Sequence, residues 1–398
     1  MNRGPPDPRW AEATRLVRAG GGPETAARVH PVAVNPPVQR GSTVVLPSAA
    51  ELYRAPVTYG RQGLATQEAL VEALRVLERA EHVALFPSGA AAVAGALLAV
   101  LKAGDEVLAA DGVYGPTRRF CDTVLARFGV STRWFPPRAS AEEVMALAGP
   151  ATRLVLMESP ASLTFEVQEV ATVAAAARAR GLLTAIDSTW GAGVLLKPLD
   201  AGVDLSIQSL TKYVGGHADV FMGSVAVRDP ALARLLDAQV HDLGWAVSPD
   251  DAYMMLRGLR TLTTRLRAHE AGGLHVARAL QGRPEVAEVL HPALPSSPDH
   301  AVWGATFSGS NGLFGAVLRP APRAAVEAML DALRLFSLGF SWGAYESLAI
   351  WCDPQLKRTA APVRPVGPLL RLHVGLEDPD DLLADLDRGF AALTAAGR

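Results

Sequence analysis

The chain has 398 residues and a formal net charge of −2, with 38 Lys and Arg residues against 40 Asp and Glu residues. Such a length exceeds what one hydrophobic core serves, so we expect at least two domains. The balanced charge argues against nucleic acid or a membrane surface as partner, and no apolar run predicts a signal sequence or a bilayer span. Two cysteines argue against a disulfide framework or a structural zinc site and fit a reducing cytoplasm.

Residues 1–63 are rich in proline and turn-forming residues, with one predicted helix from Trp10 to Arg18. The segment is too short to form a core of its own, so we expect an arm that wraps another part of the assembly, such as a neighbouring subunit. Within it, Thr58-Tyr59-Gly60-Arg61 has two interpretations. It is a surface turn, or Tyr59 and Arg61 reach a phosphate outside their own subunit.

From residue 64 to residue 257, short apolar runs alternate with helix-like stretches. The predicted strands are Val83–Phe86, Val107–Ala110, Arg153–Met157, Leu182–Ile186, Leu205–Gln208 and Gly223–Val227. The predicted helices are Ala90–Lys102, Pro116–Phe128, Ala141–Leu147 and Val170–Arg180, with Gly181 at a helix-ending position. Continuous apolar strands between helices predict an α/β fold with a mostly parallel sheet covered on both faces. Ligands bind such sheets at the carboxyl ends of the strands.

From residue 258 to residue 398 the pattern predicts a smaller α+β domain. Its predicted elements are a basic helix Leu259–Glu270, the strands Leu313–Leu318 and Leu369–Val374, and the helices Ala321–Leu335 and Asp378–Ala395. We therefore divide the chain into an arm at 1–63, a larger domain at 64–257 and a smaller domain at 258–398.

Lys212 lies in the sequence Ser209-Leu210-Thr211-Lys212-Tyr213, directly after an apolar strand. A lysine at the end of a buried strand is costly unless it has a role there. The hydroxyls of Ser209 and Thr211 can hold a phosphate, and a lysine beside a phosphate can form a Schiff base with an aldehyde. Pyridoxal 5′-phosphate is held in this way. An ordinary surface lysine is the alternative.

Three other strand ends carry groups that such a cofactor needs. Ser88 and Gly89 begin an Ala-rich helix. The first N–H groups of this helix form an anion site, or Ser88 is an ordinary N-cap. Asp187 ends a strand one strand–helix–strand step before Lys212 and can keep the ring nitrogen protonated, or it caps a turn. Tyr114, beside Gly115 and Pro116, can stack on the ring or serve as a turn residue.

Arg371 lies inside the otherwise apolar strand of the smaller domain. An arginine in that position needs a partner, and a bidentate arginine is typical of sites that bind an amino-acid carboxylate. An internal ion pair, for example with Glu377, is the alternative. The five groups support one interpretation, because each lies at or near the end of a predicted strand, where a ligand can reach it. They are Lys212, Ser88 with Gly89, Asp187, Tyr114 and Arg371.

These motifs resemble the pyridoxal-phosphate enzymes of cysteine and methionine metabolism, over residues 14–395, with the bacterial cystathionine β-lyase branch as the closest match. The resemblance rests on Leu85–Val93, Met157–Pro160, Thr189–Leu195, Ser209–Tyr213, Leu256–Leu262, His291–Pro295, Ser341–Ser347 and Arg371–Asp378. Trp342 is similar to the β-lyases, since γ-type relatives usually carry leucine there.

The resemblance implies an aspartate-aminotransferase-type fold (fold type I) with a seven-stranded sheet, in a homodimer at least and, by family pattern, a homotetramer. It implies that Lys212 is the Schiff-base lysine and proton shuttle, that Asp187 holds the ring nitrogen, and that Tyr114 stacks on the ring and assists deprotonation. The implied phosphate ligands are Ser209, Thr211, the backbone of Gly89 and Ala90, and Tyr59 and Arg61 of the neighbouring subunit. The implied binders of the amino-acid substrate are Arg371, Ser341 and Trp342.

The implied reaction is β-elimination at the carbon–sulfur bond of cystathionine, a step of transsulfuration and methionine biosynthesis that gives homocysteine, pyruvate and ammonia. The alternatives are a lyase for cysteine or S-substituted cysteines, a γ-elimination or γ-replacement enzyme, and a catalytically silent cofactor-binding regulator. No metal is expected. Four departures from the family bear on the far end of the substrate or the cofactor surroundings: Ser188 for asparagine, Gln62 for arginine, Arg119 for an acidic residue and Phe340 for tyrosine.

Overall fold

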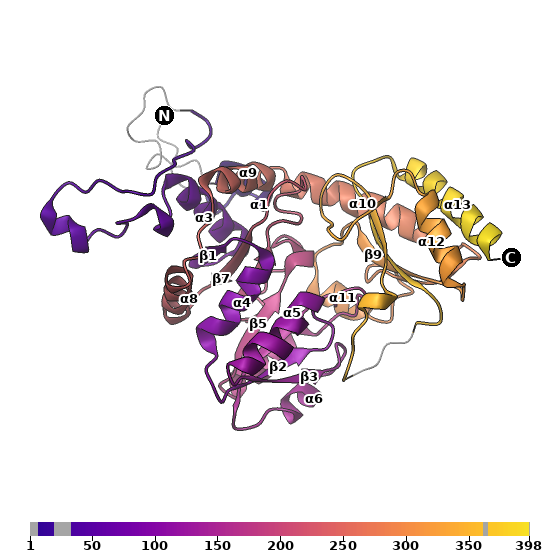
Figure 1. The fold of residues 1–398 in the computed structure, drawn as a ribbon, viewed down its shortest axis with the longest axis horizontal. Helices are drawn as coiled ribbons and strands as arrows, with labels where there is room; N and C mark the ends of the chain where they lie inside the picture. The colour runs from indigo at the N-terminus through magenta and orange to yellow at the C-terminus, as the bar shows by residue number, and fades with distance from the viewer. Residues whose placement is uncertain (1–6, 20–32, 361–364, 398) are drawn as a thin grey trace.

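The structure is a computed structural model that describes residues 7–19, 33–360 and 365–397. Parts of the predicted arm, residues 1–6 and 20–32, lie outside the described residues. The helix predicted in the arm is α1 (Glu12–Arg18), and two short 3-10 turns follow at Ala49–Tyr53 and Gly60–Gln62. Figure 1 shows the indigo segment before α3 (Ala65–Glu78) extending away from the two sheets.

The larger sheet has seven strands in the order β1-β7-β6-β5-β4-β2-β3. Its strands are β1 (His82–Phe86), β2 (Glu106–Ala110), β3 (Ser131–Phe135), β4 (Thr152–Glu158), β5 (Leu183–Asp187), β6 (Leu205–Ser209) and β7 (Gly223–Val227). Only β7 runs antiparallel to its neighbours, so the prediction of a mostly parallel sheet is confirmed. The one strand of this sheet that was missed is β3, whose first three residues are polar, as suits an edge.

Helices cover both faces of this sheet. On β2, Val107 and Ala109 belong to one hydrophobic core and Leu108 and Ala110 to another, because successive side chains point to opposite faces. The first core is closed by α4 (Gly89–Val100) and α8 (Pro230–Asp242), and the second by α6 (Ala141–Ala146) and α7 (Val170–Ala179). A third core joins α3 to α9 (Pro249–Leu259).

Two predicted helices differ from the observed ones. The stretch Pro116–Phe128 divides into α5 (Gly115–Phe120) and a π-helical turn at Cys121–Leu125. The predicted basic helix at Leu259–Glu270 spans the end of α9 and the start of α10 (Leu262–Gln281). The break falls where the Thr261 hydroxyl and the Arg265 guanidinium both donate to the Gly258 carbonyl, which lies in the last turn of α9.

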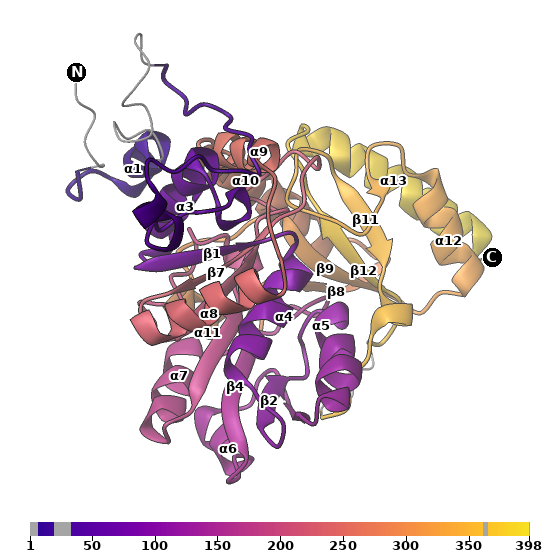
Figure 2. The ribbon, with the colours of Figure 1, turned by 60° about the vertical axis from the view of Figure 1, so that its left-hand side comes forward.

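The smaller sheet has five strands in the order β10-β11-β12-β9-β8. Its strands are β8 (Val286–Leu290), β9 (Leu313–Leu318), β10 (Ser337–Leu338), β11 (Leu348–Trp351) and β12 (Leu369–His373), and its helices include α11 (His300–Thr306), α12 (Arg323–Ala332) and α13 (Pro379–Ala396). Figure 2 shows α12 and α13 on the side that faces away from the seven-stranded sheet. Within the described ranges, no helix combines the length and apolar character needed to cross a bilayer.

The register of the parallel strands gathers polar side chains at one edge. Glu158 at the end of β4 lies opposite Asp187 at the end of β5, and Asp187 lies opposite Ile207 of β6, just before Ser209. Parallel strands end at the same edge, so the fold places these groups beside one another, where α/β sheets bind ligands.

Candidate active site

Lys212 lies where the two sheets approach each other. Its Nζ donates to the Ser341 hydroxyl at 3.0 Å and lies 5.5 Å from the centroid of the Trp342 ring. The pKa of Lys212 is lowered to about 8, chiefly by burial and also by the charge of Arg371, against the opposing charge of Asp187. The structure therefore brings together five predicted residues from distant parts of the chain and gives Lys212 an amine that loses its proton near neutral pH.

Asp187 is half-buried and anchored by Thr189. The Thr189 backbone N–H and hydroxyl both donate to Asp187 Oδ1, at 3.0 and 2.5 Å, and the Ser209 N–H donates to that same hydroxyl at 2.9 Å. Burial raises the pKa of Asp187, and the hydrogen bonds from Thr189 lower it. The carboxylate is thus held in one orientation at the sheet edge, as a partner for a cation in a site of low polarity requires. Sequence reasoning did not identify Thr189.

A second carboxyl group, that of Glu158, is buried beside Asp187. Sequence reasoning missed it. Its Oε2 accepts a 2.6 Å hydrogen bond from the Tyr114 N–H, so it fixes the loop that carries the predicted ring-stacking residue. Burial raises the pKa of Glu158, and the nearby charge of Asp187 raises it further. Like Asp187, Glu158 is an acidic residue that ends an apolar strand, so the same criterion could have found it.

Gly89 and Ser209 form a close approach suited to a phosphate. A Cβ added at Gly89 would lie 2.5 Å from Ser209 Cβ, so no side chain fits there. The Ser88 hydroxyl accepts from the Ala91 N–H at 3.1 Å as the predicted N-cap, and the N–H groups of Gly89 and Ala90 have no acceptor in the helix. Within the described chain the Ser209 hydroxyl makes no hydrogen bond. The N–H groups of Gly89 and Ala90 and the Ser209 hydroxyl together form an anion cradle.

Thr211 differs from Ser209 in its hydrogen bonds. Its hydroxyl accepts from the Met222 N–H at 3.0 Å and donates to the Met222 carbonyl at 3.1 Å. The O–H hydrogen is already used, so this hydroxyl binds a phosphate only after it turns away from Met222.

Arg371 is buried on β12, and its Nη2 donates to the carbonyls of Phe340 and Ser341 at 2.9 and 3.1 Å. The alternative of an ion pair with Glu377 is wrong, because Glu377 accepts from the Ser347 N–H and hydroxyl. No carboxylate of the described residues forms an ion pair with Arg371. A buried guanidinium without a counter-charge suits an incoming carboxylate.

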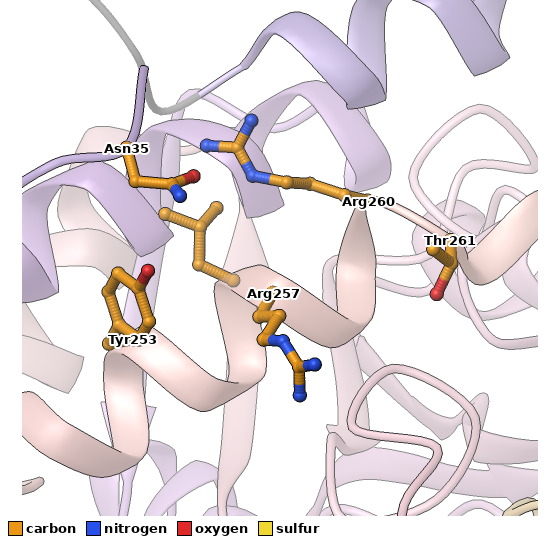
Figure 3. A pocket seen from close by; sticks show the side chains of 6 residues that line it. Asn35, Tyr253, Arg257, Arg260 and Thr261 are labelled. Carbon is orange, nitrogen blue, oxygen red and sulfur yellow. The ribbon is translucent and has the colours of Figure 1, made fainter. Parts of the chain in front are cut away.

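The structure does not bring Tyr59 and Arg61 to Lys212. Arg61 donates to the His241 carbonyl at 2.7 Å and lies over the Tyr59 ring. Both residues line a cavity of about 300 Å³ between the arm and the segment before α9. A second cavity, of about 280 Å³, also lies against α9 and is lined by Asn35, Tyr253, Leu256, Arg257, Arg260 and Thr261, none of them predicted site residues (Figure 3).

The four departures have different surroundings. Ser188 is buried, and its hydroxyl has no hydrogen-bond partner in the part of the chain that the structure describes. Gln62 accepts from the N–H groups of Thr58 and Tyr59 and so stabilises its own turn. Arg119 is exposed on α5, and Phe340 is 75% exposed beside Ser341.

The donor set fits a phosphate-bearing aldehyde with a basic ring nitrogen: an amine of lowered pKa, an anchored carboxylate, an anion cradle that a Cβ would fill, and an unpaired arginine. Tyr114, about half exposed, lies on the same edge of the sheet. Within the described residues, no cluster of side chains could hold a metal ion.

Comparison with known proteins agrees with this chemistry. The family model for Cys/Met metabolism PLP-dependent enzymes matches residues 13–391. A putative cystathionine beta-lyase of Rhizobium johnstonii is 45% identical, covering 91% of this chain and 92% of its own, and cystathionine beta-lyase MetC of Escherichia coli is 42% identical, covering 96% and 98%. A mouse cystathionine gamma-lyase is 36% identical over 84% of this chain and 85% of its own.

Solved structures give the same result. A crystal structure of metB from Corynebacterium glutamicum superposes with a TM-score of 0.90 at 29% identity, covering 97% of this chain and 99% of its own. Cystathionine gamma synthase of Xanthomonas oryzae pv. oryzae, solved with cystathionine, gives 0.89 at 32% identity over the same shares. The chain therefore belongs to the Cys/Met metabolism PLP-dependent enzymes, and pyridoxal 5′-phosphate is its cofactor.

Proposed function

We propose that this enzyme catalyses β-elimination at the carbon–sulfur bond of cystathionine, releasing homocysteine, pyruvate and ammonia. The observation that carries the proposal is the position of Lys212 Nζ between the Ser341 hydroxyl and the Trp342 ring. A lysine with a lowered pKa in that place is a base for the substrate Cα proton. The 45% identical relative is named a putative cystathionine beta-lyase and the 42% identical one cystathionine beta-lyase MetC, and both names support the β-carbon as the position of cleavage.

Lys212, Asp187 and Arg371 each have a separate role in the proposed reaction. Bound pyridoxal phosphate supplies an aldehyde that takes up the substrate amine and a ring that accepts the electron pair from Cα. The Lys212 amine takes the Cα proton and returns a proton to the leaving thiolate. Asp187, held by Thr189, keeps the proton on the ring nitrogen, and Arg371 orients the substrate carboxylate.

The proposed organisation of the chain has three parts. The arm at 1–63 serves the site of a neighbouring subunit, residues 64–257 bind the cofactor, and residues 258–398 bind the substrate carboxylate. Tyr59 and Arg61 lie away from Lys212 of their own subunit, which supports this division. If they are phosphate ligands, they serve the site of a neighbouring subunit. The assembly is a homodimer at least and, by the same family pattern, a homotetramer.

A second candidate is a lyase for cysteine or S-substituted cysteines. Arg119 favours it, since its positive charge acts on the Tyr114 hydroxyl and disfavours a substrate with an ammonium group at its far end. Steady-state rates on cystathionine, cystine and S-substituted cysteines separate the candidates. Pyruvate from cystathionine indicates β-elimination, and 2-oxobutyrate indicates the γ-reaction.

The first prediction concerns Lys212→Ala. Loss of the amine removes both the cofactor linkage and the base, so we expect the visible absorbance band of the bound cofactor to disappear. We expect turnover to fall by at least about 10³-fold, the combined effect of losing covalent and acid–base catalysis. Lys102→Ala, at an exposed position, is the control and should behave as wild type. Full turnover by Lys212→Ala would overturn the proposed function.

A further inference from the structure

The loop of Phe340 to Ala344 rests directly on the backbone of Lys212. Gly343 has a φ of +88°, and a Cβ there would lie 2.8 Å from the Tyr213 nitrogen and 3.0 Å from the Lys212 carbonyl carbon. Only glycine permits this contact. A small displacement of the loop therefore moves the Ser341 hydroxyl and the Trp342 ring relative to Lys212 Nζ.

Two side chains of β12 hold this loop. Arg371 and His373 are two residues apart on one strand, so they project from the same face. Arg371 donates to the carbonyls at the beginning of the loop, whereas His373 Nε2 lies 3.0 Å from the Gly343 nitrogen and 3.0 Å from the Ala344 oxygen at its end. With its proton on Nδ1, the imidazole accepts from Gly343, and with its proton on Nε2 it donates to Ala344. Either tautomer ties His373 to the loop.

The His373 ring packs in a mostly buried ring cluster, defined as Tyr213, His269, Trp342 and His373. Centroid distances are 5.2 Å from Tyr213 to His269, 5.3 Å from His269 to His373, and 5.4 Å from Tyr213 to Trp342. The pKa of His373 is lowered to about 3, chiefly by burial and also by the nearby His269, so the ring is neutral at physiological pH. Within the cluster, Tyr213 lies beside both His373 and Trp342, with centroid distances of 6.1 and 5.4 Å.

We propose that His373 is a positioning residue that aligns the Ser341 hydroxyl and the Trp342 ring with Lys212. Among the described residues its ring nitrogens bond the loop alone, and Nδ1 has no partner, so it acts through the loop. The inference rests on the proposed role of Lys212 in catalysis, but it does not depend on which sulfur compound is cleaved. Because Arg371 still anchors the start of the loop, loss of His373 should affect the lysine more than the binding of the substrate carboxylate.

The test compares His373→Leu with His373→Gln and with His269→Leu in the full-length holoenzyme. Leucine removes the link to the loop, whereas glutamine places an amide near the position of Nε2. His269→Leu is the matched control, because His269 belongs to the same ring cluster but bonds the Val374 carbonyl at 3.0 Å, not the loop. We expect His373→Leu to lower kcat by about 10- to 100-fold, typical of a misplaced catalytic group, with KM changed less than about threefold.

Two readouts do not depend on turnover. In His373→Leu the near-UV circular dichroism of the tryptophans changes, and the pH midpoint of the cofactor's visible absorbance moves by about half a unit or more. His373→Gln should restore both signals and kcat, and His269→Leu should keep them despite a similar loss of stability. These signals remain measurable if the enzyme proves inactive on cystathionine, so failure of the proposed function is distinguished from failure of this inference.

The proposal is overturned if folded His373→Leu keeps the wild-type kcat and absorbance midpoint, or if His269→Leu shows the same losses. Should His373→Leu fail to fold, His373→Asn replaces it, because its shorter amide stops near the position of Nδ1 and does not reach Gly343. Asparagine should then behave like the loss variant and glutamine like wild type. Equal behaviour of the two amides would equally overturn the proposal.

Discussion

The charged side chains of the site are buried or half-buried, and burial shifts the pKa of each toward the neutral form. The pKa values of Lys212 and Arg371 are lowered, and those of Asp187 and Glu158 are raised. Such pKa shifts are concentrated at functional sites, because an ordinary hydrophobic core would not retain charged groups without counter-charges. The two cations also act on each other, since the charge of Arg371 is one of the causes that lower the pKa of Lys212.

Arg371→Leu tests both roles of this arginine. Loss of a charge-assisted contact worth about 2–3 kcal/mol should raise KM by about 30- to 150-fold. Removing the positive charge should also raise the pKa of Lys212 above its value of about 8. Only the neutral amine reacts, so in cofactor-free protein the labelling of Lys212 by an amine reagent should shift to higher pH. Mass spectrometry measures that shift.

The control for this prediction is Arg371→Lys, which keeps the charge but loses the planar fork of donors. It should raise KM without moving the pH at which Lys212 is labelled. An unchanged labelling curve in Arg371→Leu would show that the two cations do not interact in the way that their burial implies.

At the scale of elements, the apolar strands of the larger sheet could be predicted, its edge strand β1 included, whereas the polar edge strand β3 could not. In the smaller sheet β8, β10 and β11 were not predicted either. β2, β4, β5 and β6 are continuous apolar runs, because helices cover both of their faces. β3 forms hydrogen bonds with β2 alone, and its sequence Ser131–Phe135 mixes polar and aromatic residues. The break between α9 and α10 depends on side chains that bond the Gly258 carbonyl, which hydrophobic periodicity does not report.

The same distinction holds for the site. Lys212, Asp187 and Arg371 are polar residues inside or at the end of apolar strands, so the sequence alone marks them out. Thr189 and His373 act through hydrogen bonds to other residues, and their partners become visible only in three dimensions. The use of the Thr211 hydroxyl by Met222 could not be predicted either, because the two residues are brought together by the turn between β6 and β7.

The anion cradle at the start of α4 gives a prediction at this scale. Gly89→Ala should force Ser209 away from the helix, because the new Cβ would lie 2.5 Å from Ser209 Cβ. We expect a loss of about 1–3 kcal/mol in the free energy of unfolding, typical of overpacking. Cofactor affinity should also fall, which equilibrium dialysis measures. Gly149→Ala is the control, since nothing lies within 4 Å of its added Cβ. Unchanged cofactor affinity in Gly89→Ala would contradict the cradle.

At the scale of the whole molecule, contacts on two sides of the site fix one sheet against the other. Lys212 bonds Ser341 on one side. On the other side, Asp111, three residues before Tyr114, accepts from the N–H groups of Thr359 and Ala360 at 2.8 Å each. The distance between Lys212 and Arg371 is therefore set by the packing of both sheets, and neither sheet alone makes the site.

The proposed exchange of the arm between subunits gives the last prediction. Lys212→Ala and Arg61→Ala should each impair the enzyme, the first by loss of the amine and the second by loss of a phosphate ligand. In a mixed dimer, one site receives Lys212 from one subunit and Arg61 from the other, so that site is intact. Random mixing of equal amounts should then restore about one quarter of wild-type activity, because half of the dimers are mixed and each has one good site of two.

Mixing also distinguishes exchange from a local role of the arm. If Arg61 served the site of its own subunit, every mixed dimer would contain one site without Lys212 and one without Arg61, and mixing would restore nothing. The mixed species must be confirmed by tagging one variant and measuring co-purification, so that a failure to exchange subunits is not taken for a failure to complement. Arg61 donates to the His241 carbonyl within its own chain, and exchange requires this contact to open or to coexist with the phosphate of the neighbouring site. His241→Ala keeps the backbone carbonyl. Added to the Lys212→Ala subunit, which supplies Arg61, it should therefore leave the restored activity unchanged.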